Sequence, residues 1–211
     1  MDNVQLKIYC DKTINGDNCN YLTNESKGSA LFCGVAYPTP ESRSDIACEK
    51  AFELATQSFL RRPSTGDAAM NTISGFINDR LYMLQEPRKE FLCDTAFLYI
   101  HHGYARVALS GNSCGYHFCN GKIVNSYRSE GIWYGRQPKW ERKPDAEIPL
   151  EKVSQDFLLV SGESNVDISP EDVDRLLSGD DLESFFQGKR CFAVMIHLPE
   201  RKKRFPLFGK R

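Results

Sequence analysis

The sequence lacks a long apolar run, a leader-like start and an excess of charge of one sign. Its 27 Lys and Arg residues almost balance its 28 Asp and Glu residues, which gives a formal net charge of -1. A chain with so little net charge has no overall electrostatic attraction to nucleic acid or to an anionic membrane. No apolar stretch is long enough to cross a bilayer. We therefore expect a cytoplasmic protein with no membrane span and no nucleic-acid partner.

The eight cysteines include no Cys-x-x-Cys pair. Scattered cysteines in a reducing compartment are usually small buried side chains and seldom disulfides. A zinc site is also disfavoured, because Cys114, His117 and Cys119 have no second ligand pair nearby. The sequence therefore predicts reduced cysteines that fill the core.

The length of 211 residues fits one domain with a core of ordinary size. Alternating or compact apolar patterns predict strands over Val4–Tyr9, Ser29–Tyr37, Thr95–Ile100, Ala105–Ser110, Gly115–Phe118, Lys122–Val124, Asp156–Ser161 and Cys191–Leu198. Helical spacing or a capped start predicts helices over Ser44–Leu60, Asn71–Gln85, from Ser169 onward and over Asp181–Phe186. We expect a single domain over residues 1–200, followed by a basic C-terminal tail over residues 201–211.

Residues 125–149, which we call the flap, combine glycine and proline with charged and aromatic side chains. This composition is typical of a long surface loop, and such loops often carry function. Four flap residues are candidates for a binding surface: Trp133, Tyr134, Arg136 and Trp140. The alternative is a loop whose aromatic side chains pack against one another.

Three segments carry a resemblance to a known family: a strand and turn over Ala105–Tyr116, a strand over Asp156–Glu163 and a helix start at Ser169–Glu171. They resemble segments of the metal-dependent protein phosphatases of the PPM (type 2C) family, in particular its bacterial members. Ala105–Tyr116 is similar to the family's Val-Ala-Asn-Val-Gly-Asp-Ser-Arg-Ala strand and turn. Asp156–Glu163 is similar to its Asp-Phe-Leu-Leu-Leu-Ala-Thr-Asp-Gly strand, and Ser169–Glu171 then opens a helix as expected. The resemblance extends from about Gly16 to about Leu198. It implies an α+β fold, a sandwich of two antiparallel sheets flanked by helices.

The resemblance also implies where an active member would hold two divalent cations with aspartates. Hard cations such as Mn²⁺ and Mg²⁺ need oxygen ligands, and a bound cation generates the attacking hydroxide. The four acidic positions fall on residues that are not acids: Asn18, Cys33, Gly162 and Lys189. Asp17 and Glu163 lie one residue away and are the candidates for any shifted, weaker metal site. We therefore expect no catalytic residues, no cofactor and no bound metal.

These replacements predict a pseudophosphatase, a catalytically silent binding or regulatory module in Ser/Thr phosphorylation signalling. Its expected partner is a protein or phosphoprotein, for example a Ser/Thr kinase. The alternative is a weakly active Ser/Thr protein phosphatase with a remodelled Mn²⁺ or Mg²⁺ site.

Overall fold

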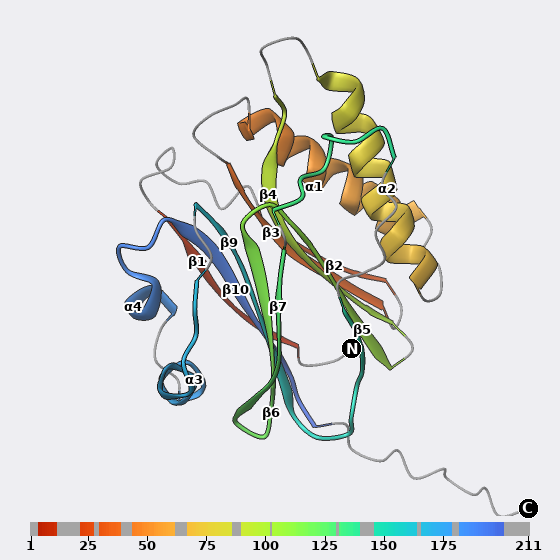
Figure 1. The fold of residues 1–211 in the computed structure, drawn as a ribbon. Coiled ribbons are helices and arrows are strands. Elements are labelled where there is room, and N and C mark those ends of the chain that lie inside the picture. Colours follow the sequence, from red (N-terminus) through yellow and green to blue (C-terminus); the bar gives the residue numbers. More distant parts are fainter. Residues whose placement is uncertain are drawn as a thin grey trace, which may run out of the picture.

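The computed structural model describes residues 4–11, 22–27, 30–38, 44–61, 67–85, 90–101, 103–129, 131–139, 146–163, 166–178 and 182–200. These residues form two five-stranded antiparallel sheets packed face to face, with helices on both outer faces (Figure 1). This architecture confirms the predicted α+β sandwich.

The first sheet has the strand order β1-β10-β9-β6-β7. Its strands are β1 (Gln5–Cys10), β6 (Ser113–Cys119), β7 (Lys122–Arg128), β9 (Gln155–Gly162) and β10 (Cys191–Leu198). The short helices α3 (Pro170–Leu177) and α4 (Leu182–Phe186) pack on its outer face. β7 lies at one edge of this sheet, and its pairing with β6 shifts register between His117 and Phe118.

The second sheet has the strand order β2-β3-β4-β5-β8. Its strands are β2 (Leu22–Lys27), β3 (Ala30–Pro38), β4 (Cys93–His101), β5 (Tyr104–Ser110) and β8 (Ala146–Pro149). Two long helices, α1 (Ser44–Arg61) and α2 (Asp67–Leu84), cover its outer face (Figure 1). The sequence pattern does not predict β2 or β8, because β2 is mostly polar and β8 is very short.

Successive side chains of a buried strand point to opposite faces of its sheet, and this divides the core into three layers. One layer lies between the two sheets, one lies under α1 and α2, and one lies under α3 and α4. On β3, Cys33, Val35 and Tyr37 face the other sheet, whereas Phe32 and Ala36 face α1 and α2. On β9, Phe157 and Leu159 likewise face between the sheets. This alternation decides which residues at the strand ends can meet in the space between the two sheets.

The cysteines follow the sequence prediction with one exception. Six described cysteines are free, and all but Cys119 are buried. Cys10, the last residue of β1, is instead disulfide-bonded, so the prediction of reduced cysteines was wrong there. The expectation came from a presumed reducing compartment, and that argument cannot detect an individual cross-link.

No helix among the residues described combines the length and the apolar character needed to cross a membrane.

The helix α3 begins as its sequence indicates. The Ser169 hydroxyl accepts a hydrogen bond from the Asp172 backbone N–H, and the Asp172 carboxylate accepts one from the Ser169 backbone N–H at 2.9 Å. With Pro170 in the first turn, this reciprocal capping box fixes where the helix starts.

Candidate functional site

Cys33 lies in the middle of β3 and is fully buried between the sheets. It pairs with Leu98 on β4, and burial raises the pKa of its thiol to about 12. The thiol is therefore neutral at physiological pH and serves as part of the apolar core.

Tyr37, near the end of the same strand, brings a polar group to one end of the sandwich. Its ring packs edge-on against Phe192 of β10, with 5.3 Å between ring centroids. The fully buried hydroxyl has no hydrogen-bond partner among the residues that the structure describes. Burial raises the pKa of Tyr37, the charges of Glu163 and Asp11 raise it further, and Arg190 opposes them. Tyr37 thus marks a place where charged residues flanking the ends of β1, β9 and β10 converge.

An ion pair joins the ends of β9 and β10 beside Tyr37. Arg190 Nη1 lies 3.1 Å from Glu163 Oε1, and the Glu163 backbone N–H donates to the Arg190 carbonyl at 3.0 Å. This arrangement holds an arginine cation between the ends of the two strands.

Gly162 stands directly opposite Cys191 in the β9–β10 pairing. A Cβ atom added to Gly162 would lie 2.5 Å from Cys191 Cβ and 2.6 Å from the Arg190 carbonyl oxygen. Because backbone atoms close this space, no side chain fits at position 162 without a shift of β10.

Lys189 points toward α4. Its Nζ lies 4.4 Å from the centroid of Phe185 and 5.5 Å from that of Phe186. Its carbonyl also accepts a hydrogen bond from the Tyr9 hydroxyl at 3.2 Å. The next residue, Arg190, pairs instead with Glu163, and its charge acts on Tyr37.

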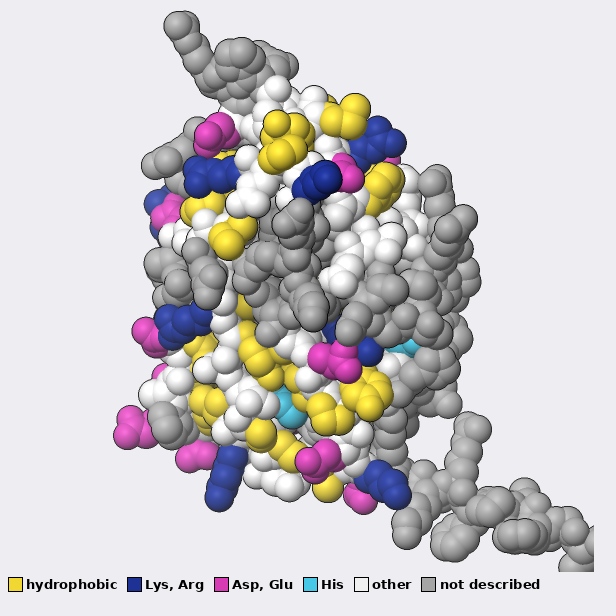
Figure 2. Space-filling view, turned by 45° about the vertical axis from the view of Figure 1, so that its right-hand side comes forward, with side chains coloured by type: hydrophobic (Ala, Val, Ile, Leu, Met, Phe, Trp, Pro, Cys, Tyr) yellow, Lys and Arg dark blue, Asp and Glu magenta, His cyan; other side chains and the backbone are white. Residues whose placement is uncertain are grey.

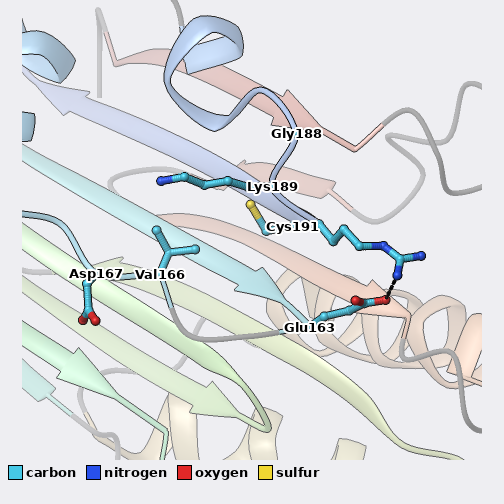
Figure 3. A pocket seen from close by; sticks show the side chains of 7 residues that line it. Glu163, Val166, Asp167, Gly188, Lys189 and Cys191 are labelled. Carbon is cyan, nitrogen blue, oxygen red and sulfur yellow. Dashed lines mark ion pairs between the residues drawn. The ribbon is translucent and has the colours of Figure 1, made fainter.

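A pocket of about 400 Å³ lies around this end of β10. It is lined by Glu163, Val166, Asp167, Gly188, Lys189, Arg190 and Cys191. Figure 3 shows the Glu163–Arg190 ion pair at one end of the pocket and Lys189 extending toward the other. The candidate site thus includes Gly188–Cys191 and the chain that leaves β9.

Asp94, the second residue of β4, is a fully buried carboxylate at the same end of the sandwich. Its Oδ1 accepts hydrogen bonds from the Asn112 backbone N–H at 2.8 Å and from Trp133 Nε1 at 2.9 Å. Burial raises the pKa of Asp94 to about 6, although both hydrogen bonds oppose this rise. Asp94 joins the β5–β6 turn to the flap.

The flap residues 131–139 are fixed to the body by polar contacts. The Tyr134 side chain is fully buried, and its hydroxyl hydrogen bonds with Ser74 of α2 at 3.0 Å. Asn78 of α2 accepts from the Gly135 N–H at 2.9 Å and donates to the Gln137 carbonyl at 3.0 Å. Tyr134 is therefore an anchor with no exposed surface to offer a partner.

Trp133 and Arg136 remain at the surface of the flap. The Arg136 guanidinium lies 4.6 Å from the Trp133 ring centroid and 3.6 Å from the Glu90 carboxylate. Large apolar side chains are exposed at the end of α2, including Met83 at 74% exposure. Figure 2 shows hydrophobic side chains gathered near the top of the molecule. In the described part of the flap, the Arg136 guanidinium lies over the Trp133 ring, and this pair is the surface that a partner could contact.

The described residues do not fit the di-metal centre that the sequence resemblance implies. They contain no group of three or more His, Cys, Asp or Glu side chains placed to hold a metal ion. Cys33 is buried in apolar surroundings, and the Glu163 carboxylate is bound to Arg190. The candidates Asp17, Asn18 and Trp140 lie outside the described residues.

The structure brings Gly162, Glu163 and Lys189 to the same end of the sandwich but leaves Cys33 farther along β3. Sequence reasoning did not name Tyr37, Asp94 or Asp11 as candidate site residues. The signal for Tyr37 was the alternation of Cys33, Val35 and Tyr37, which places all three side chains on one face. Asp94 and Asp11 are single acids at strand ends, and no local pattern marks them.

No protein-family model and no curated protein matches the sequence. Solved structures do match. The S. agalactiae serine/threonine phosphatase has 13% sequence identity and a TM-score of 0.65, covering 94% of this chain and 100% of the other. RsbX in complex with magnesium has 12% identity and a TM-score of 0.64, with coverages of 93% and 96%.

The catalytic domain of the serine/threonine protein phosphatase PstP, solved with two manganese ions, has 14% identity and a TM-score of 0.61. The alignment covers 92% of this chain and 97% of that domain. At such low identity the likeness concerns the fold alone. This chain has the fold of the bacterial PPM-type Ser/Thr phosphatases.

Proposed function

We propose that this protein is a PPM-fold pseudophosphatase, a catalytically silent binding or regulatory module in Ser/Thr phosphorylation signalling. The single observation that carries the proposal is the Arg190–Glu163 ion pair, at 3.1 Å, beside the buried Tyr37 hydroxyl. A pair of divalent cations needs several free carboxylates, and here an arginine side chain already neutralises the acid.

Gly162 supports the same proposal. Asp at this position would place a carboxylate against the Cys191 and Arg190 backbone, where even a Cβ atom lacks space. The close packing at Gly162 supports a site without an acid at this position. A Gly162→Asp side chain would fit only after a shift of β10.

The flap supplies the proposed contact surface for a partner protein or phosphoprotein, such as a Ser/Thr kinase. Trp133 and Arg136 lie on a segment that Tyr134, Asn78 and Asp94 hold in place. Because the segment is fixed before binding, a partner would lose little affinity to ordering it. Trp and Arg are also the residue types that contribute most at protein interfaces.

The alternative is a weakly active metal-dependent Ser/Thr phosphatase. The observation in its favour is that the charges of Asp11 and Glu163 both raise the pKa of the Tyr37 hydroxyl, so both acids act on one point at the end of the sandwich. One or two carboxylates can hold Mg²⁺ or Mn²⁺ when substrate phosphate completes the coordination shell.

A hydrolysis assay separates the two functions. The full chain is incubated with p-nitrophenyl phosphate and with a phosphothreonine peptide, in millimolar Mn²⁺ or Mg²⁺ and in EDTA. We expect no release of phosphate above the buffer rate in any of these conditions. Metal-dependent turnover that disappears in Asp17→Ala or Glu163→Ala would overturn the pseudophosphatase proposal and favour the enzyme.

A further inference from the structure

We propose that Asn120, at the tip of the β6–β7 hairpin, is a site of spontaneous chemical modification, where the side-chain amide converts to aspartate and isoaspartate through a cyclic succinimide. The reaction is a deamidation, and water is its co-reactant. In Figure 1 the hairpin tip lies at the bottom of the sandwich, away from α1 and α2. The modification is therefore independent of the proposed function, which concerns the other end of the molecule.

The hairpin tip is a two-residue turn. Cys119 pairs with Lys122, so Asn120 and Gly121 alone join the two strands. Both turn residues have a positive φ, which is 51° for Asn120 and 74° for Gly121. This conformation is typical of a type I′ turn, in which Asn-Gly is a preferred pair. The turn therefore explains why these two residues stand in this order.

An asparagine followed by glycine can react with its own backbone. The Gly121 nitrogen, after loss of its proton, attacks the Asn120 side-chain carbonyl carbon and forms a new C–N bond. The bond from that carbon to the amide nitrogen breaks, and the nitrogen leaves as ammonia. Water then opens the five-membered ring at either carbonyl, which gives aspartate or isoaspartate. Because glycine has no side chain, it does not block the approach and it permits wide backbone rotation.

The reacting groups are accessible and are not held in place. Both Asn120 and Gly121 are exposed, and a Cβ atom added to Gly121 would meet no other atom within 4 Å. Neither the Gly121 N–H nor the Asn120 side chain has a hydrogen-bond partner among the residues that the structure describes. The amide and the attacking nitrogen are therefore free to rotate toward each other.

The hairpin tip can also open without unfolding the sheet. Two paired positions separate the turn from the register shift between His117 and Phe118. β7 is an edge strand and is largely exposed, so few contacts hold its first residues. A short, exposed end of this kind opens locally at a low cost in free energy. Such opening gives Asn120 the backbone rotation that ring closure needs.

Two other asparagines in the described part of the chain serve as internal comparisons. Asn125, on β7, is also exposed, but it precedes a serine and lies within the β6–β7 pairing. Asn112 precedes the buried Ser113, and its backbone N–H donates to Asp94. Comparison with Asn125 thus separates the effect of the turn and its glycine from that of exposure.

Conversion changes both the charge and the backbone at the hairpin tip. Either product adds one carboxylate, so the formal net charge falls by one from its value of -1. Isoaspartate also adds a methylene group to the main chain, and a two-residue turn cannot keep its geometry with a longer chain. The isoaspartyl carboxylate is the chemical group that protein isoaspartate methyltransferases methylate, with S-adenosylmethionine as the methyl donor.

The test is peptide mapping by mass spectrometry of the full chain, aged in warm, mildly alkaline buffer and sampled over time. We expect the mass increase of deamidation at Asn120, with isoaspartate identified by enzymatic methylation. The rate at Asn120 should exceed the rates at Asn112 and Asn125 by about tenfold or more, a factor that corresponds to about 1.4 kcal/mol in activation free energy. Peptide mapping also separates Asn120 from Asn15, which precedes Gly16 outside the described residues.

The informative variant is Asn120→Gly, which accepts the positive φ and removes the reactive amide. We expect methylation of the hairpin peptide to be lost in this variant, while the rates at Asn112 and Asn125 stay unchanged. Far-ultraviolet circular dichroism checks that the variant folds. A synthetic peptide of residues 118–124 gives the rate for the same sequence without the fold.

An intact Asn120 in the folded chain, under conditions in which the synthetic peptide converts, would overturn the proposal by showing that the turn protects the amide. Equal rates at Asn120 and Asn125 would overturn the role given to the turn and its glycine. Methylation of the hairpin peptide that persists in Asn120→Gly would overturn the assignment to this residue.

Discussion

Arg190 Nη1 lies 3.1 Å from Glu163 Oε1, and this contact joins the start of β10 to the chain just after β9. The two side chains are 61% and 27% exposed, so solvent screens most of their attraction. We expect a double-mutant cycle of Arg190→Met and Glu163→Gln, measured by urea unfolding, to give a coupling free energy of about 0 to 1 kcal/mol. A coupling of several kcal/mol would show that the pair is the main stabilising element of this end of the sandwich.

Divalent cations should not stabilise the fold. A ligand that binds only the native state at a hundredfold excess over Kd stabilises it by about 2.7 kcal/mol. Since Glu163 is already bound to Arg190 and Gly162 has no side chain, we expect equal melting temperatures in EDTA and in millimolar Mn²⁺ or Mg²⁺. Differential scanning calorimetry measures this. A rise of several degrees that is lost in Asp17→Ala would contradict the expectation.

Gly162→Ala should destabilise the protein. The new Cβ would lie 2.5 Å from Cys191 Cβ and 2.6 Å from the Arg190 carbonyl, so the backbone of β10 must move. Overpacking of this kind costs about 1 to 3 kcal/mol. Chemical denaturation provides the measurement.

The matched control for that variant is Gly75→Ala in α2, where a Cβ meets nothing within 4 Å. An added helix-favouring residue in open space should stabilise the protein by about 0.5 to 1 kcal/mol. If both alanine variants changed stability in the same direction, the packing argument for Gly162 would be wrong.

Asp94 should make the stability depend on pH between about 4 and 6. Its pKa in the folded protein is raised from 3.8 to about 6 by burial. Folding therefore favours the protonated form, and the associated stability, fully present below pH 3.8, is lost as pH rises through 6. A shift of this size corresponds to roughly 3 kcal/mol at neutral pH.

Asp94→Asn tests this directly because it keeps an oxygen for the Asn112 and Trp133 donors. We expect the variant to gain stability relative to the parent as pH rises from about 4 to 7. Urea unfolding at a series of pH values measures the difference. A difference that stays constant over this range would mean that Asp94 does not titrate there.

Removing the Tyr134 anchor should loosen the flap. Tyr134→Phe loses the hydrogen bond to Ser74 and leaves that hydroxyl buried, which costs about 1 to 3 kcal/mol. Amide hydrogen exchange should then rise at Trp133 and Gly135 more than in the sheets. Ser74→Ala in the Tyr134→Phe background should recover part of the loss, because no buried hydroxyl then remains unpaired.

The strand pattern predicts most of the fold because buried strands here are compact and apolar. β3 and β9 follow this pattern, and so do the helices α1 and α2. The same pattern fails for β2, a polar strand that the sequence alone does not distinguish from a loop. Its place in the sheet depends on backbone pairing with β3. Backbone pairing does not require apolar side chains, so the hydrophobic pattern of the sequence does not reveal it.

The candidate site is harder to predict because an offset of one residue changes the face of a strand. Sequence reasoning placed two degenerate positions at Gly162 and Lys189, whereas their neighbours Glu163 and Arg190 have side chains that act on Tyr37. The locations of the strand ends were predictable. The direction of each side chain was not, because Glu163, Lys189 and Arg190 lie just beyond the strands, where turn hydrogen bonds and the Glu163–Arg190 ion pair orient them.

The β7 edge has a further consequence, for solubility. An edge strand presents unpaired backbone groups to other chains, and β7 has an exposed Val124 along that edge. Lys122 and Arg128 stand at its two ends, and the irregular pairing beside His117 and Phe118 interrupts the regular ladder. Charges and register breaks are means by which proteins prevent strand-by-strand aggregation. The cations of β7 thereby help keep two copies of the molecule from joining their sheets.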